Sequence, residues 1–158
     1  MTSARFLAAC EGPLRAEHLA DVRAITMGRP EAARDPAAQW YVARETQLRS
    51  ALARARAQRQ GVDPQRHIRP FSGYDAQTDE VVAQAMNTPD PLERTLLLDR
   101  YRWHLLDQMV GPETFGLAAV VAYAFKLLLA ERLQALNEAE GMASAERIVN
   151  GNLAGLDL

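Results

Sequence analysis

Cysteine, lysine and aromatic residues are scarce in this chain. Of its 158 residues, one is cysteine, one is lysine and 6% are aromatic, whereas arginine occurs seventeen times. A single cysteine excludes an intramolecular disulfide framework, and no charged segment followed by an apolar one opens the chain. We therefore expect a cytoplasmic protein in which Cys10 is a small apolar residue on a helix face rather than a reactive thiol.

The sequence also lacks the pattern of a β-strand. No stretch alternates polar and apolar residues for long enough to predict a strand, whereas apolar residues recur at helical spacing between Gly and Pro residues that end the helices. The length suits one domain with a sizeable core. We predict an all-α, single-domain helical bundle over residues 1–158. Helices are expected over residues 3–10, 15–27, 36–60, 77–86, 91–110 and 115–139.

Signatures of catalysis are missing as well. The three histidines are scattered at His18, His67 and His104, and the chain contains no Glu-x-x-His pair, HExxH or CxxC motif. It has neither a phosphate-binding glycine loop nor a nucleophile signature. The sequence pI near 5.9 and the lack of a recognised module argue against nucleic-acid binding. We expect no enzyme activity, cofactor, metal or small-molecule substrate.

The most apolar stretch runs from residue 117 to 130, where the only polar side chains are Tyr123 and Lys126. Nearly every face of such a helix has to be covered by protein. About 14 residues are too few to span a bilayer, and a cation interrupts them, so we expect no membrane insertion. The stretch is interpreted as the central helix of the bundle.

The last two helices are expected to pair as a long antiparallel hairpin, over about 91–110 and 115–139, at the centre of the core. One stripe of the first helix consists of Leu92, Leu96, Asp99, Trp103, Leu106 and Val110, and one stripe of the second of Phe115, Ala119, Ala122, Lys126, Leu129 and Leu133. Both repeat in alternating steps of four and three. Facing residues of an antiparallel pair have residue numbers with a constant sum, and a sum of 225 matches all six pairs. The core-packing residues are therefore predicted to be Leu96, Trp103, Ala122 and Leu129.

The same register places Asp99 opposite Lys126. An unpaired ammonium in an apolar stripe is costly, and Lys126 has no acid three or four residues away on its own helix. We therefore predict a structural ion pair between Asp99 and Lys126 that sets the register of the hairpin. The alternative is that Lys126 extends along the surface and places its ammonium in water.

Arginine is concentrated between residues 40 and 69, where seven arginines accompany Glu45 and Asp63. The helix expected over 36–60 carries many of them on its polar side, so this face is a candidate for docking an acidic partner. The alternative is that this face is simply exposed to water and binds no partner. Trp40 is either a lid on the core or an interface anchor. The candidate partner-binding residues are Trp40, Arg44, Arg49, Arg56 and Arg59.

Several segments together resemble a known family. They are ARFLAAC with a following Leu14, residues 40–49, NTPDPLERTLLLDRYRWHLLD over 87–107, Phe115, VVAYAFKLLLAERLQAL over 120–136, and a following EGM. The combination of LD-x-YRW with F-x4-VVAY-x-FKL-x2-AER is specific in aggregate. It resembles a group of bacterial proteins encoded within V-type (A/V-type) ATPase operons and classified as a domain of unknown function.

This resemblance implies a non-catalytic accessory or central-stalk subunit of a bacterial V-type ATPase. Members of the group are thought to stand in for the C (or d) subunit, which couples the rotor shaft to the membrane ring through protein contacts. The implied partners are other ATPase subunits, and the implied location is the cytoplasm, at the inner membrane through the complex. The alternative is a free-standing helical adaptor that binds an acidic protein through its arginine-rich face.

Overall fold

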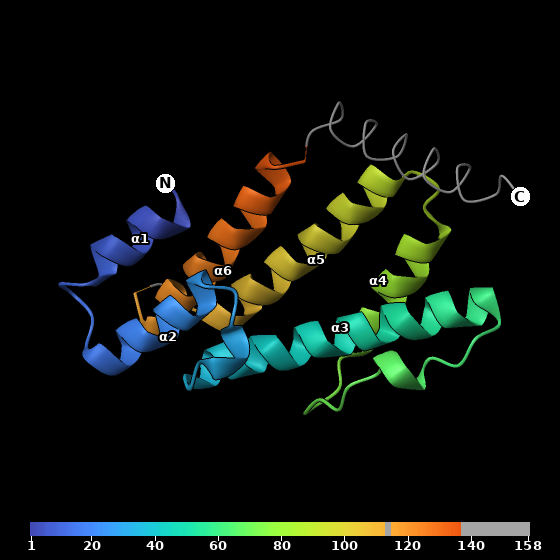
Figure 1. Ribbon diagram of the computed structural model, residues 1–158, viewed down its shortest axis with the longest axis horizontal. Coiled ribbons are helices and arrows are strands. Elements are labelled where there is room, and N and C mark those ends of the chain that lie inside the picture. The colour runs from blue at the N-terminus through green and yellow to red at the C-terminus, as the bar shows by residue number, and fades with distance from the viewer. Residues whose placement is uncertain (113–114, 137–158) are drawn as a thin grey trace, which may run out of the picture.

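The computed structural model describes residues 1–112 and 115–136, and this part of the chain is all-α (Figure 1). The prediction of the fold class is thereby confirmed. The α-helices are α1 (Ser3–Cys10), α2 (Ala16–Thr26), α3 (Pro36–Gln60), α4 (Ala76–Asn87), α5 (Pro91–Val110) and α6 (Leu117–Gln134). Short 3-10 turns occur at η1 (Pro30–Ala32) and η2 (Gln65–His67). No helix among the described residues is long and apolar enough to cross a membrane.

Capping residues set the helix ends close to where the sequence predicts them. The side chain of Asp35 accepts hydrogen bonds from the backbone N–H groups of Ala37 and Ala38 at 2.9 and 3.1 Å. Asp90 caps α5 in the same way. Gly61 ends α3 in the left-handed conformation, with φ of 67°. Thr2 caps α1, and the N–H of Ser3 donates to Glu131 of α6.

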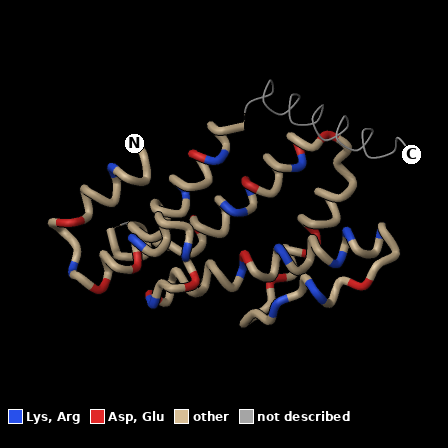
Figure 2. The backbone as a smooth tube through the Cα atoms, in the orientation of Figure 1, with Lys and Arg blue, Asp and Glu red and all other residues tan. Residues whose placement is uncertain are grey.

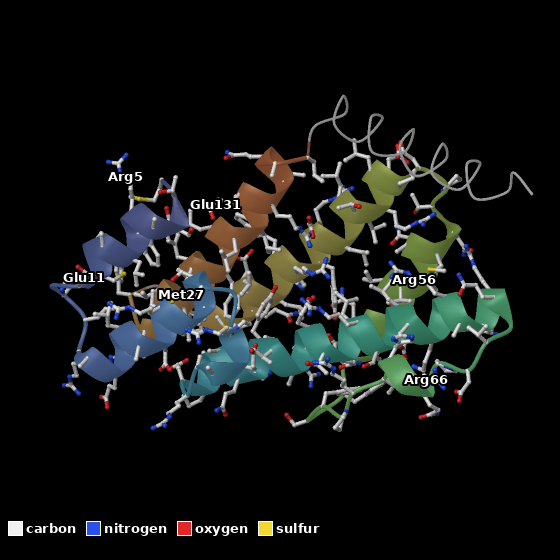
Figure 3. The ribbon with its side chains drawn as sticks, viewed as in Figure 1. Arg5, Glu11, Met27, Arg56, Arg66 and Glu131 are labelled. Atoms are coloured by element: carbon white, nitrogen blue, oxygen red, sulfur yellow. The ribbon has the colours of Figure 1, made fainter. Side chains whose placement is uncertain are left out.

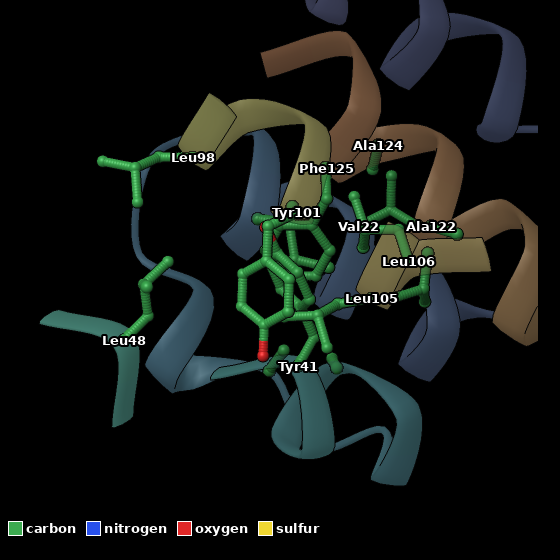
Figure 4. Close-up of a cluster of buried hydrophobic side chains, with 14 of the residues drawn as sticks. Val22, Tyr41, Leu48, Leu98, Tyr101, Leu105, Leu106, Ala122, Ala124 and Phe125 are labelled. Carbon is green, nitrogen blue, oxygen red and sulfur yellow. The ribbon is translucent and has the colours of Figure 1, made fainter. Parts of the chain in front are cut away.

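The helices form a core where α2, α3, α5 and α6 meet. In Figure 1, α5 and α6 lie side by side and antiparallel, α1 and α2 lie against α6, and α4 lies against α3 and α5. Figure 4 shows the buried cluster that fills this junction. Its largest fully buried apolar side chains are Ile25, Leu48, Leu105, Leu106, Val22 and Val121.

The predicted hairpin is present, but its second helix has different bounds. Helix α6 begins at Leu117 rather than at residue 115, and Phe115 is fully exposed, at 101%. The helix ends at Gln134, and residues 137–139 of the predicted range lie outside the described part. The connection between the helices is therefore longer than the four residues on which the predicted register depends.

The predicted register and its ion pair are wrong. Lys126 pairs with Asp107 at 2.5 Å, whereas Asp99 pairs with Arg102 at 3.0 Å and with Arg132. The partner of Asp99 on α6 thus lies six residues beyond the expected one, nearly two helical turns. The physical reason is that α6 is apolar on almost every side and packs against α1, α2, α3 and α5. Its apolar pattern therefore does not specify which stripe faces α5.

Trp103 is also misplaced by that register, because it is 42% exposed rather than part of the core. The ammonium of Lys126 lies 4.9 Å from the centroid of its indole ring, so the pair forms a cation–π contact on the outside of the hairpin. Ala122 is buried as predicted, Leu129 packs at the edge of the core, and Leu96 is half-buried. Helix α5 instead buries Leu98, Tyr101, Arg102, Leu105 and Leu106.

Candidate docking surface

The arginines of α3 do not form one face. At 100° per residue, the side chains of Arg49 and Arg56 project from one side of the helix, whereas that of Arg54 projects from nearly the opposite side. All three are exposed, as is Arg59 near the end of the helix. Figure 2 shows basic positions along the second half of α3 and the turn after it. In Figure 3, Arg56 and Arg66 lie at the end of the molecule opposite Arg5.

Arg44, one of the predicted docking residues, is buried and therefore does not belong to the surface. It is 6% exposed, and its guanidinium donates a hydrogen bond to the backbone carbonyl of Ser72. Gly73 follows with φ of 67°, and a Cβ atom there would lie 2.7 Å from Arg44 Nη2. The long connection from α3 to α4 thus covers Arg44, which helical periodicity alone does not reveal.

Two further buried polar side chains of α3 hold the same connection. Gln47 donates to the carbonyl of Asp75 at 2.7 Å and accepts from its N–H at 3.0 Å. The Ser50 hydroxyl accepts from the N–H of Arg69 at 3.2 Å. Arg44, Gln47 and Ser50 are spaced by three residues, so this row of α3 supplies partners to backbone groups that lack secondary structure. The row holds α4 and its N-terminal approach against α3.

A groove lies between the second half of α3 and helix α4. Its volume is about 530 Å³. Small and apolar side chains line its floor, and arginines lie along its α3 side. The lining residues are Ala51, Arg54, Ala55, Gln58, Arg59, Asp79, Val82, Ala83, Met86 and Asn87. Because Ala51 and Ala55 are small, the two helices leave a hollow where larger residues would fill the contact.

The groove is cationic along its α3 side. Arg54 and Arg59 are exposed on the two sides of the alanine row, and the guanidinium of Arg59 donates to the carbonyl of Met86 near the end of α4. The only acid in the lining, Asp79, accepts a hydrogen bond from the Tyr74 hydroxyl. That bond raises the pKa of Tyr74. An apolar floor beside cations fits an amphipathic helix that carries acidic residues.

The other predicted docking residues lie outside this groove, apart from Arg59. Arg49 donates to Glu45 at 2.7 Å, and its side chain is 75% exposed. Trp40 is 39% exposed and lies 5.9 Å from the Arg44 guanidinium. Arg54, which the predicted set omitted, is the better candidate. The spacing of small residues at 51 and 55 between two arginines is the sequence signal that identifies it.

A charge network joins α3, α5 and α6, and all of its members except the exposed Arg132 are largely covered by protein. We define it as Glu45, Asp99, Arg102 and Arg132. Arg102 donates to both carboxylate oxygens of Glu45, at 2.8 and 3.0 Å, and to Asp99 at 3.0 Å. Arg102 is 8% exposed. Burial acts to lower its pKa, but its hydrogen bonds to Glu45 and the charge of that carboxylate outweigh the effect, so the pKa lies above its ordinary value.

The network also acts on a neighbouring tyrosine. Tyr41 is 4% exposed and packs against Phe125 with ring centroids 4.5 Å apart. Burial, together with the nearby Glu45 carboxylate, raises the pKa of Tyr41 far above its ordinary range. On the other side of α5, Tyr101 hydrogen-bonds to Thr78 and Asp75, both at 2.7 Å, and burial raises its pKa to about 12. Both phenols are therefore neutral at physiological pH.

Comparison with known proteins identifies a family. The family described as "Protein of unknown function (DUF2764)" matches residues 74–153, just over half of the 158 residues. This chain belongs to the DUF2764 family. Within the described residues, the DUF2764 match covers α4, α5 and α6, so the groove has one wall inside the match and one wall, α3, before it. No curated protein and no solved structure matches the chain.

Proposed function

We propose that this DUF2764 protein is a non-catalytic accessory or central-stalk (C/d-like) subunit of a bacterial V-type ATPase. In this role it couples the rotor shaft to the membrane ring through protein–protein contacts. It is then held at the cytoplasmic side of the inner membrane by the complex. ATP hydrolysis and ion flow belong to other subunits.

The observation that carries the proposal is the sequence resemblance described above. Its LD-x-YRW segment supplies Asp99 and Arg102 of the charge network and the buried Tyr101. Its FKL segment supplies Phe125, which packs on Tyr41, and Lys126, which pairs with Asp107. These residues hold the helices together, so we interpret the resemblance as one of fold, and the fold in turn presents a surface to a partner. A subunit that transmits force works through such a surface.

The groove between α3 and α4 is the surface that we assign to docking. Its apolar floor supplies contact area, and Arg54 and Arg59 supply charge that steers and orients an acidic partner. The same features support the second candidate function, a free-standing adaptor for an acidic helical protein. The two functions differ in the identity of the partner and not in the surface used.

Co-purification from the native bacterium tests the proposal. The protein would be tagged at its chromosomal locus, and membranes would be solubilised in mild detergent at low salt, where charge contacts persist. We expect catalytic, shaft and ring subunits of the V-type ATPase to elute with it in stoichiometric amounts. Recovery of none of them from an extract with intact ATPase activity would contradict the proposal. Recovery of one acidic helical protein from outside the ATPase would support the adaptor function instead.

A further inference from the structure

A second cavity, separate from the groove, lies between α3, α5, α6 and the turn after α2. Its volume is about 430 Å³, within the range of small-molecule sites. It shares no residue with the groove. Its lining consists of Gly28, Pro30, Glu31, Tyr41, Val42, Glu45, Thr46, Arg49, Arg69, Arg102, Phe125, Leu128, Leu129 and Arg132.

One side of this cavity is apolar. The residues of this apolar wall are Val42 of α3 and Phe125, Leu128 and Leu129 of α6. Phe125 is 6% exposed and fixed by its ring contact with Tyr41, whereas the two leucines pack at the edge of the core. The wall is therefore supported from behind by the bundle. It suits the hydrocarbon part of a ligand.

The other side is charged and held in place. Glu45 and Arg102 of the charge network line the cavity, and their two hydrogen bonds fix both side chains. Arg132 lines it as well and is held by Asp99. Tyr41, which is 4% exposed, lines the cavity as well. A neutral phenol beside arginines is a donor to an anion, and burial keeps it neutral by raising its pKa.

The charges around the cavity leave an excess of one cation. Four arginines line it (Arg49, Arg69, Arg102 and Arg132), against Glu31 and Glu45 in the lining and Asp99 behind it. Arg102 uses all three of its nitrogens on Glu45 and Asp99, whereas Arg49 and Arg132 each use one nitrogen in their ion pairs. The remaining donors therefore belong to Arg49, Arg132 and Arg69, which has no ion pair among the described residues. Arginine forks bind carboxylates in a bidentate manner. A ligand with a single negative charge balances the site.

We infer that this cavity binds a small monocarboxylate with an apolar tail. The carboxylate lies at the end formed by Arg69, Arg132 and the Tyr41 hydroxyl. The hydrocarbon tail lies along Val42, Phe125 and the two leucines of α6. This site does not depend on the proposed function, because it is tested on the purified protein alone.

Isothermal titration of the purified protein with octanoate, below its micelle concentration, tests the site. We expect saturable binding with a stoichiometry near one. Acetate lacks the tail, 1-octanol lacks the charge and octylamine reverses it, so each is expected to bind at least tenfold more weakly. No binding of octanoate at millimolar concentration would overturn the inference. Equal binding of 1-octanol would overturn the assignment of the arginines as the recognition element.

Substitutions locate the binding site. Arg132→Gln and Arg69→Gln are each expected to weaken octanoate binding about tenfold, because each removes a charge-assisted donor. Arg69→Gln is expected to leave folding intact, because that side chain is exposed and belongs to no ion pair among the described residues. Weaker binding in this variant can therefore not be attributed to unfolding. Arg56→Gln, an exposed arginine outside the cavity, is the matched control and should leave the affinity unchanged. Unchanged affinity in both cavity variants would place the ligand elsewhere and refute the site.

Discussion

Replacing Glu45 by Gln tests the charge network most sharply. The Glu45 carboxylate accepts two hydrogen bonds from the buried Arg102, at 2.8 and 3.0 Å, and one from Arg49 at 2.7 Å. Gln keeps the size of the side chain but replaces one acceptor oxygen by an amide that points its own hydrogens at the guanidinium. Removing one partner of a buried pair typically costs about 3–5 kcal/mol. Arg102 retains Asp99 at 3.0 Å, so we expect a loss of about 2–3 kcal/mol.

Urea unfolding at pH 7 and 25 °C measures this loss directly. For a chain of this length, about 2–3 kcal/mol corresponds to a fall in Tm of roughly 5–10 °C. The matched control is Glu80→Gln on α4, because Glu80 is exposed and has no ion pair in the described residues. Its effect should stay within about 0.5 kcal/mol. A Glu45→Gln protein as stable as the control would refute the reasoning that Arg102 depends on this carboxylate.

Three further predictions concern stability. At pH 8 the phenol of Tyr41 is neutral in the folded and unfolded states, but at pH 11 only the unfolded state ionises, because the folded-state pKa is raised. Between pH 8 and pH 11 the free energy of unfolding should therefore fall by about 1.4 kcal/mol less in Tyr41→Phe than in wild type. Equal losses in urea unfolding would count against the pKa shift. Asp99→Asn should destabilise by about 1–2 kcal/mol, because two guanidinium groups share that carboxylate, whereas Asp107→Asn, at a more exposed pair, should cost at most about 1 kcal/mol. The reverse order in thermal unfolding would contradict the role of Asp99 as the shared partner of two guanidinium groups. Gly73→Ala should lower the free energy of unfolding by about 1–2 kcal/mol, because φ is positive at this residue and the new Cβ meets Arg44. Gly12→Ala, where nothing lies within 4 Å of the new Cβ, is the control, and equal urea midpoints for the two variants would argue against the Arg44 contact.

The ends of α3 and the beginning of α5 were predictable from the sequence because they depend on neighbouring residues. Asp35-Pro36 and Asp90-Pro91 each combine a capping carboxylate with a proline that needs no hydrogen-bond partner, and Gly61 adopts the left-handed conformation that ends α3. These signals act over three or four residues. The fold class followed from them together with the absence of strand patterns.

The register of the hairpin was not predictable in the same way. Many of the residues of α6 are apolar, so several stripes fit equally well against α5, and the matching of one acid to the single lysine selected the wrong one. The long side chain of Arg132 reaches Asp99, and Lys126 reaches Asp107 across Trp103. The register of the hairpin depends on contacts of α6 with α1, α2 and α3, and the stripes of the two hairpin helices contain no information about those contacts.

The candidate site was predicted only in part. The concentration of arginine on α3 is real, and Arg59 belongs to the groove. Periodicity treats each arginine alike, however, and it cannot show that a distant connection buries Arg44 or that Glu45 binds a guanidinium 57 residues away. Both contacts join segments far apart in the sequence. Whether the exposed arginines bind a partner stays a prediction.

The most direct test of the docking role compares two charge reversals in co-purification at low salt. Arg54→Glu with Arg59→Glu reverses the cationic side of the groove, and Arg5→Glu with Arg15→Glu makes the same change in charge on exposed residues near the N-terminus. We predict that V-type ATPase subunits elute with the wild-type protein and with the N-terminal variant but are lost from the groove variant. Equal recovery of these subunits with both variants would contradict the assignment of the groove, and their absence from the wild-type sample would contradict the function itself.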